Sequence, residues 1–269
     1  MDRLRKREVT PMFELARYEA RRRLRGALYL SVGLSLLAGM YIGTFPSIAT
    51  DIDLDEFIEQ MPDIFKELFN LATMNTIEGF LAAELYSIGW TLLLGLYVAY
   101  SAASLIAEDV DRERMDILLS LPISRARLLG EKFLALGVPI VVVNVVVPVV
   151  VFAGTAAIGY PIDPVNLAIV HALSIPYLLA CGGIGIVLSV LVDRATIAQR
   201  GSLVLLFGLF LFESLTVVAG YDWLGSIAPM RYFNPTDVLV ESSYDLLGGA
   251  VLLVGAIALV AASAVYFRR

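Results

Sequence analysis

The chain has 269 residues and a net charge of −6, with 58% of its residues hydrophobic and only 17% charged. Globular proteins contain about 45–50% apolar residues, so a soluble chain of this length could not bury so much apolar surface in its own core. The composition excludes a soluble enzyme, a disordered chain and a secreted disulfide scaffold, and it indicates that lipid surrounds much of the chain. The single cysteine, Cys181, excludes an internal disulfide, and the single histidine, His171, leaves almost no material for a metal site, so we expect no bound metal.

Six stretches of the chain are apolar and long enough to cross about 30 Å of hydrocarbon. They are Ala27–Phe45, Ser87–Ala107, Phe133–Ile158, Leu167–Val192, Ser202–Gly220 and Leu246–Phe267. None contains Lys or Arg, and Glu213 in the fifth is their only acidic residue. Because a backbone in lipid must satisfy its own hydrogen bonds, helices are favoured. We therefore expect an all-α, polytopic membrane protein with six transmembrane helices, formed as one domain over residues 1–269.

Basic residues are distributed very unequally between the two sides that six spans would create. Eighteen of the 20 Lys and Arg residues fall on the side of the termini, and only Lys66 and Arg231 fall on the other. The positive-inside rule then makes both termini cytoplasmic, in a multi-pass protein of a prokaryotic cell (plasma) membrane. The outward side carries 14 acidic residues, and two interpretations stay open: cation binding, or hydration of the surface in the salty medium of a halophile.

Three segments outside the spans are too long or too patterned for simple turns. Residues 1–26 contain an amphipathic pattern over Thr10–Arg25, which either lies on the inner membrane surface as a helix or serves only as a basic flank. The outer loop of residues 46–86 contains a second amphipathic pattern, between Leu54 and Phe69. The outer loop of residues 221–245 is rich in aromatic residues and suits a re-entrant hairpin that dips into the outer leaflet.

The cytoplasmic segment of residues 108–132, which we call the elbow, combines charged and apolar residues in an unusual order. We expect the second span to continue into the cytosol as a helix through a charged run, until Pro122 removes a backbone donor and ends it. Ser124 can then cap a new helix that passes Arg125 and leads into the third span. Leucines rimmed by charge favour a docking site for another protein, although the same pattern also suits a connector that lies on the membrane.

The elbow resembles that of type 2 ABC transporter permeases, the ABC-2 exporter class. In that family a charged run is followed by leucines, Pro-x-Ser-Arg and a lysine. The matching residues here are Glu108 to Arg114, Leu118-Leu119-Ser120-Leu121, Pro122-Ile123-Ser124-Arg125 and Lys132. The resemblance extends over nearly the whole chain, through the basic N-terminal segment, the six spans and the two long outer loops. The chain departs from the family at Met115-Asp116, where many members have Gly-Thr.

The resemblance implies a permease subunit that exports a substrate with the help of a separate ATPase subunit. Because the chain has no G-x-x-x-x-G-K-[ST] phosphate loop, we expect it to be non-catalytic and to bind no cofactor, with ATP and Mg²⁺ on the partner. The implied assembly contains two ATPase subunits and a second permease copy, as a homodimer, in membrane lipid and without nucleic acid. The residues expected to couple to the ATPase are Glu113, Arg114, Met115, Asp116, Leu118, Leu119, Pro122, Ser124 and Arg125. A non-transporting membrane anchor or scaffold that recruits a cytosolic partner is the alternative of a different class.

Four residues within the spans carry further expectations. Gly39 and Gly43 form a G-x-x-x-G pair in the first span, which the resemblance places near the contact between permease copies. Asn144 in the third span is costly to expose to lipid, so we expect it to face the bundle, where contact with substrate stays open. Glu213 has three open roles: an acceptor for groups of the last outer loop, a residue lining the translocation pathway, or a hydrated residue near the outer interface.

Overall fold

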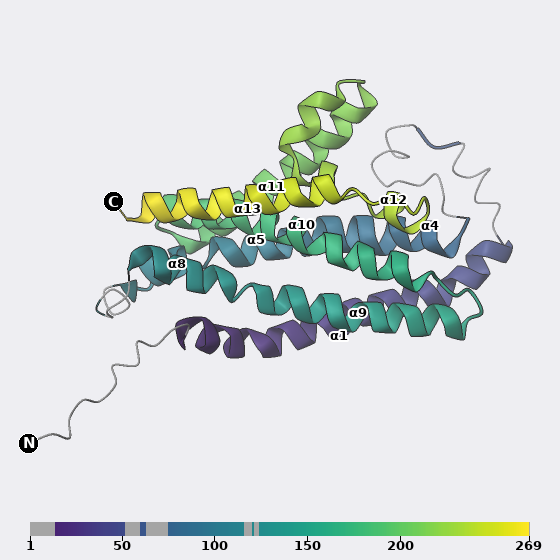
Figure 1. Cartoon of the computed structure of the whole chain (residues 1–269), viewed down its shortest axis with the longest axis horizontal. Coiled ribbons are helices and arrows are strands. Elements are labelled where there is room, and N and C mark those ends of the chain that lie inside the picture. Colours follow the sequence, from purple (N-terminus) through teal and green to yellow (C-terminus); the bar gives the residue numbers. More distant parts are fainter. Residues whose placement is uncertain (1–13, 52–59, 63–74, 116–119, 121–123, 269) are drawn as a thin grey trace, which may run out of the picture.

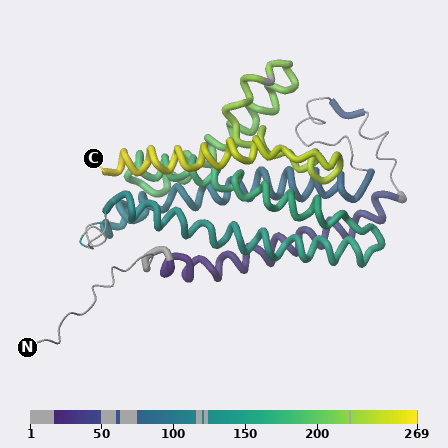
Figure 2. Tube along the Cα trace, in the orientation of Figure 1, coloured from purple at the N-terminus to yellow at the C-terminus, as the bar shows by residue number. Residues whose placement is uncertain are grey.

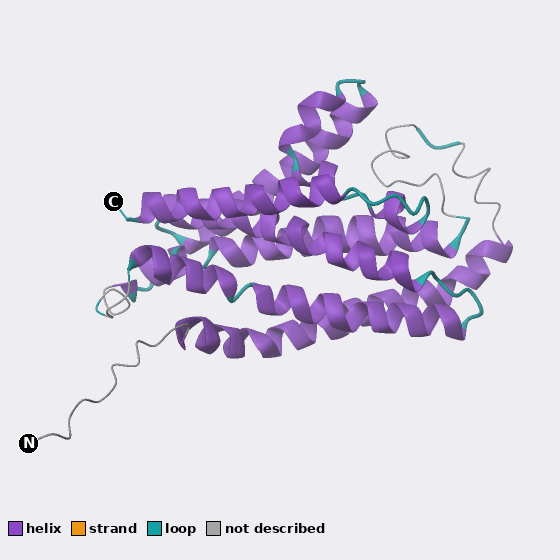
Figure 3. Ribbon diagram, viewed as in Figure 1, coloured by secondary structure: helices purple, strands orange, loops and turns teal. Residues whose placement is uncertain are grey.

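The computed structural model describes residues 14–51, 60–62, 75–115, 120 and 124–268 of the chain. Within these ranges every regular element is a helix (Figure 3), and six helical segments are long and apolar enough to cross a membrane. These findings confirm the prediction of an all-α protein with six spans. The spans are α1 (Glu14–Asp51); α4 (Ile77–Leu81), the π-helix η2 (Ala82–Leu94) and α5 (Gly95–Ala103) in succession; α8 (Arg125–Leu134) followed by α9 (Gly137–Ala157); α10 (Pro164–Leu191); α11 (Ala195–Val218); and α13 (Leu246–Phe267). The shorter elements are α6 (Ala107–Asp111), the 3₁₀ helices η3 (Asp222–Ile227) and η4 (Pro229–Tyr232), and α12 (Pro235–Leu239).

The spans form one elongated bundle with α10 near its centre (Figures 1 and 2). α10 packs against α5, α9, α11 and α13, while α1 lies along α9. α1 begins and α13 ends at the same end of the bundle, where α8 also begins (Figure 1). We call this the termini end, and the opposite one the loop end. The last part of α11 and η3 form a light-green hairpin that projects from the side of the bundle in Figure 1.

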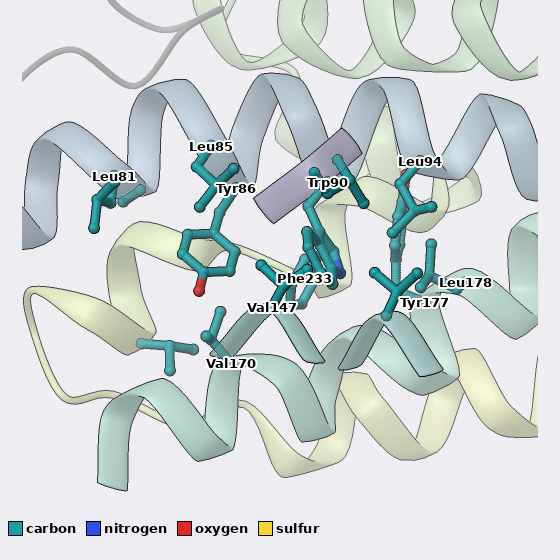
Figure 4. Packing of buried hydrophobic residues seen from close by; sticks show 14 of the residues in the cluster. Leu81, Leu85, Tyr86, Trp90, Leu94, Val147, Val170, Tyr177, Leu178 and Phe233 are labelled. Atoms are coloured by element: carbon teal, nitrogen blue, oxygen red, sulfur yellow. The ribbon is translucent and has the colours of Figure 1, made fainter. Parts of the chain in front are cut away.

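The core of the bundle is aromatic and lies between η2 and α10 (Figure 4). Tyr86, Trp90 and Tyr177 are almost completely buried there. The hydroxyl of Tyr177 donates to the carbonyl of Thr91 at 2.6 Å. Phe233, which follows η4, stacks on Tyr177 with the ring centroids 5.3 Å apart. The last outer loop therefore folds back onto the middle of α10 instead of extending away from the bundle.

Small residues allow α10 to approach α5 closely. A Cβ added to Gly185 would lie 2.2 Å from the carbonyl oxygen of Ala99 and 2.8 Å from the Cβ of Ala102, so only glycine fits at this position. Cys181 and Ser189, one turn to either side of Gly185, are also buried. This stripe packs internally, and close backbone approach of this kind is how helices associate within lipid.

The second span begins ten residues earlier than the sequence predicts. Thr76 caps it by accepting from the backbone amide of Gly79 at 3.1 Å, and the helix continues from Ile77 through Glu84. The prediction that Glu213 is the only acid within a span is therefore wrong, since a rule that excludes charges placed the start of this span too late. Glu84 accepts a hydrogen bond from Tyr41 in α1, which gives its carboxylate a partner.

The middle of this span is wound as a π-helix because side chains compete for its carbonyl groups. Ser87 Oγ donates to the carbonyl of Ala82 at 2.8 Å, and Thr91 Oγ1 donates to that of Tyr86 at 3.0 Å, in each case five residues back. π-Helical turns are rare and occur frequently at functional sites. Here the wider turn lies between the aromatic core and the outer pocket described below.

The N-terminal amphipathic pattern is part of the first span. The structure shows one continuous helix, α1, of 38 residues, which is roughly 57 Å at 1.5 Å per residue. The expected separate helix on the membrane surface is not present over Glu14–Arg25, because nothing between these residues and Ala27 interrupts the helical hydrogen bonds. The amphipathic pattern expected between Leu54 and Phe69 lies almost entirely outside the described residues.

Candidate functional site

The second span does not continue into the elbow as one helix, so that prediction is wrong. α5 ends at Ala103, and a turn precedes the short helix α6. Ser189 in α10 accounts for this break, because its buried Oγ accepts from the backbone amides of Ile106 at 2.9 Å and Ala107 at 3.1 Å. The hydroxyl replaces the intrahelical partners that these two amides would otherwise need.

The end of α6 aims the elbow back toward the bundle. Glu113 has a φ of 54°, the left-handed conformation that usually calls for glycine. The amide of Arg114 bonds to the carbonyl of Asp109 at 2.8 Å, and that of Glu113 bonds to the carbonyl of Val110 at 3.0 Å. This pair of bonds is a Schellman motif, which stops α6 and turns the chain so that Arg114 returns to Asp109.

The second helix of the elbow begins where the sequence predicts. Ser124 Oγ accepts from the backbone amide of Arg127 at 3.3 Å and caps α8, which confirms the capping prediction. Arg125 donates to the carbonyl of Phe267 at 3.3 Å and lies over its ring, so the start of α8 is held against the end of α13. Asp116, Leu118, Leu119 and Pro122, which complete the expected coupling residues, lie outside the described residues.

A buried group of charges joins the first part of the elbow, at α6, to α1 and α8. The Nζ atom of Lys132 lies 2.5 Å from Asp109 Oδ2 and 3.8 Å from Glu19 Oε1, and the Lys132 and Asp109 side chains are only 7% and 8% exposed. Arg114 also pairs with Asp109, at 3.0 Å. Removing one partner from a buried pair leaves an uncompensated charge and typically costs about 3–5 kcal/mol. These charges fix the elbow to two spans at one point.

Sequence reasoning placed Lys132 at the start of the third span but missed its partners. Glu19 and Lys132 are 113 residues apart in the chain, so no local pattern connects them. The available signal was the polarity of α8, where Glu131 and Lys132 are both buried although they enter a span. Buried charges are almost always paired, and this rule could have indicated a charged partner without naming it.

A second polar site, which we call the outer pocket, lies between η2, α11 and the last outer loop. It is a cavity of about 200 Å³ lined by the polar residues Ser87, Thr91, Glu213, Ser214, Arg231 and Asn234, together with apolar residues. Glu213 Oε1 lies 3.9 Å from the Nη1 of Arg231, and the two side chains are 19% and 32% exposed. Glu213 is therefore paired with a cation of the last outer loop, and its role in the pathway stays a prediction.

Asn144 lies in a different place from Glu213, within a buried network between the second, third and fourth spans. Its amide donates to the carbonyl of Ile140 at 2.9 Å, and its Oδ1 accepts from Ser174 at 2.7 Å and faces His171 Nδ1 at 2.9 Å. The other ring nitrogen of His171 lies 3.0 Å from the hydroxyl of Tyr86. Asn144 faces the bundle as expected, and both polar atoms of its amide have partners there.

The two glycines proposed for the dimer contact face away from the rest of the chain. A Cβ added to Gly39 or Gly43 would meet nothing within 4 Å. Leu36 and Met40 on the same face are 71% and 54% exposed. Neither glycine serves packing within the described part of this chain, and the face they share is open.

The six-span helical bundle with a charged elbow at one end is the fold of a polytopic membrane protein. The family of ABC-2 transporter proteins matches residues 14–268, and the chain therefore belongs to the ABC-2 transporter family. This match confirms the resemblance seen in the elbow and makes the chain a membrane permease of an ABC transporter. A search of curated proteins finds no match to the chain.

Proposed function

We propose that this chain is the permease subunit of an ATP-driven exporter and that a separate ATPase subunit drives it through the elbow. The observation that carries the proposal is the buried charge group of Lys132, Asp109 and Glu19, together with the contact of Arg125 with α13. A loose connector would not need such fixed joints. A push on the elbow would act at once on α1, α8 and α13, which are rigid helices.

In this proposal the ATPase binds ATP and Mg²⁺, and this chain performs no chemistry. Two ATPase subunits act on two permease copies, and both termini are cytoplasmic, so the termini end faces the ATPase. The second copy is expected against the open faces of this chain. One is the Gly39 and Gly43 face of α1; the other is the projecting hairpin, where Trp223 and Ile227 are 72% and 70% exposed.

The outer pocket is the best candidate for a part of the pathway within one copy. Most of the described residues inside the spans are apolar, whereas this cavity combines an acid, a base, an amide and three hydroxyl groups. Ionisable residues at membrane depth usually face a bundle interior or a water-filled cavity and mark transport routes. The pair is long at 3.9 Å, so Glu213 and Arg231 can each turn toward a substrate of opposite charge.

The docking surface can be tested by pull-down with an ABC ATPase in detergent. Leu119→Asp places a carboxylate in an apolar contact without a partner, which is expected to cost roughly 1–3 kcal/mol, or about 5- to 150-fold in affinity. The control is Ile197→Asp, which changes an exposed apolar residue in the first turn of α11 at the same end of the bundle. Equal binding by wild type and Leu119→Asp would remove the elbow as the docking site.

A further inference from the structure

A second cavity lies at the termini end, between α1, α5 and the elbow. Its volume is about 380 Å³, which falls within the usual range of roughly 300–1,000 Å³ for small-molecule sites. Four basic residues line it: Arg22 and Arg23 from α1, Arg114 from the elbow and Lys132 from α8. The proposed ATPase coupling uses the ion pairs of Lys132 at one side of this cavity and gives the cavity itself no role.

The acidic residues of the cavity are already engaged. Asp109 pairs with Lys132 and Arg114, Glu19 pairs with Lys132, and Glu108 pairs with Arg114 and Arg112. Within the described ranges of the chain, Arg22 and Arg23 form no ion pair. The wall that α1 contributes therefore carries two arginines without an ion pair in these ranges, beside Glu19, which pairs with Lys132.

Two guanidinium nitrogens in the cavity wall lack acceptors. Arg23 Nε and Arg114 Nε are inaccessible to solvent, and neither finds a hydrogen-bond partner in the described part of the chain. A buried donor without an acceptor is costly, and nearly all such groups in folded proteins are paired. A turn of either side chain would bring its Nε to an anion bound between α1 and the elbow.

The remaining wall, from α5 and the turn after it, suits the headgroup region of a phospholipid. Tyr97, Tyr100, Ser101 and Ser104 bring hydroxyl groups to the cavity, and Leu105 adds an apolar surface. Arg22 and Arg23 precede Ala27, where the uncharged part of α1 begins, so the cavity lies where the helices pass from lipid to water. Tyrosine and basic residues concentrate at this level of a membrane.

We propose that this cavity binds the phosphate of an anionic phospholipid from the leaflet at the termini end. The guanidinium groups of Arg22 and Arg23 hold the phosphate oxygens, because charge-assisted bonds from arginine to phosphate are strong and directional. The hydroxyl groups of α5 contact the rest of the headgroup. The bound lipid joins α1 to the elbow, so lipid composition controls how firmly this end of the bundle is assembled.

The proposal can be tested by thermal unfolding of the purified full chain after removal of lipid. The probes are phosphatidylglycerol, phosphatidylcholine with the same acyl chains, and inorganic phosphate. Phosphatidylglycerol is expected to raise the midpoint of wild type far more than phosphatidylcholine does. In Arg22→Gln/Arg23→Gln the concentration for half of the effect should rise at least tenfold, because two phosphate contacts are lost.

The control is Arg21→Gln/Arg25→Gln, which removes the same charge from the same helix at residues that do not line the cavity. This variant should respond to phosphatidylglycerol as wild type does, and an equal loss in both variants would overturn the proposal. Protection by phosphatidylcholine equal to that by phosphatidylglycerol would also overturn it. Protection by inorganic phosphate alone at the same concentrations would make the cavity a site for a soluble anion and overturn the lipid assignment.

A second variant keeps the test decisive if Arg22→Gln/Arg23→Gln fails to fold. Tyr100→Phe/Ser101→Ala removes two hydroxyl groups without changing charge, and the half-effect concentration should rise by about threefold or more. Native mass spectrometry of both variants should show fewer retained phosphatidylglycerol molecules than in wild type. Wild-type retention in both would overturn the proposal.

Discussion

The two ion-paired sites of the bundle differ in how tightly their partners are held. At the termini end, Lys132 and Asp109 are 2.5 Å apart and almost fully buried. At the loop end, Glu213 and Arg231 are 3.9 Å apart, partly exposed and beside a cavity of about 200 Å³. The first arrangement suits a joint that transmits motion without yielding. The second suits a site whose charges can change partners.

The largest effect is expected for Lys132→Met, which leaves Glu19 without its partner and Asp109 with Arg114 alone. The cost should be about 3 kcal/mol, the lower end of the range for broken buried pairs, because Arg114 still compensates Asp109. Arg231→Met, which breaks the half-exposed pair at the loop end, should cost about 1 kcal/mol or less. Thermal unfolding in detergent measures both, and equal losses would show that the two sites are held alike.

The next effect concerns helix packing on the two sides of α10. Gly185→Ala places a methyl group against the carbonyl of Ala99, which should push α10 from α5 and cost about 1–3 kcal/mol. Gly208→Ala in α11 is the matched control, because nothing lies within 4 Å of its added Cβ. That change should be neutral or stabilise, since alanine favours a helix by up to about 1 kcal/mol. Equal stability of the two variants would contradict the observed packing.

How much of the fold could be predicted from the sequence depends on how far apart in the chain the interacting residues lie. The six spans and the Ser124 cap follow from local patterns of hydropathy and capping. The break after α5 does not, because it depends on Ser189, more than 80 residues away. The start of the second span was misplaced because the rule that excludes charged residues rejected Glu84. In the structure, Tyr41 of α1 lies beside Glu84 as a polar partner.

The residues of the candidate site also divide into those that the sequence indicates and those that only the arrangement of the helices brings together. Resemblance located the elbow, and the charge rule singled out Glu213 as an unusual residue. Neither could supply Arg231 or Glu19 as partners, because an ion pair between distant segments requires the arrangement of the helices. Asn144 shows the same limit, since its burial was predicted while its contacts with His171 and Ser174 were not.

Glu213→Gln tests whether the charge of Glu213 is needed for transport or for stability. The substitution keeps shape and hydrogen bonding but removes the charge, and because the pair with Arg231 is long, the free energy of unfolding should change by less than about 1 kcal/mol. Transport should fall if the outer pocket is part of the pathway, while Glu241→Gln, an exposed acid at the same end, should transport as wild type does. Wild-type transport by Glu213→Gln from about pH 5 to 8 would remove the pathway role, and failure to assemble would make the residue structural.

The smallest effect is a pH dependence at the loop end. Burial raises the pKa of Asp237 above its ordinary value of 3.8, and the carboxylates of Glu241 and Asp245 raise it further. The folded chain keeps this proton to a higher pH than the unfolded chain, so the free energy of unfolding decreases as the pH rises above 3.8 through that window. Asp237→Asn retains an acceptor for the Asn234 amide and removes this decrease. Unfolding midpoints between about pH 4 and 7 should then vary less than in wild type, and an unchanged slope would contradict the assignment.

The central claim is that an ATPase drives this chain through the elbow. The direct measurement is the rate of ATP hydrolysis by the partner ABC ATPase in proteoliposomes, with wild type, with Pro122→Ala and without this chain. We predict that wild type stimulates hydrolysis several-fold, and that Pro122→Ala inserts normally but loses most of the stimulation, because alanine restores a backbone donor and relaxes the restricted backbone angle of proline. A hydrolysis rate that is the same with wild type, with Pro122→Ala and in liposomes without this chain would contradict the account.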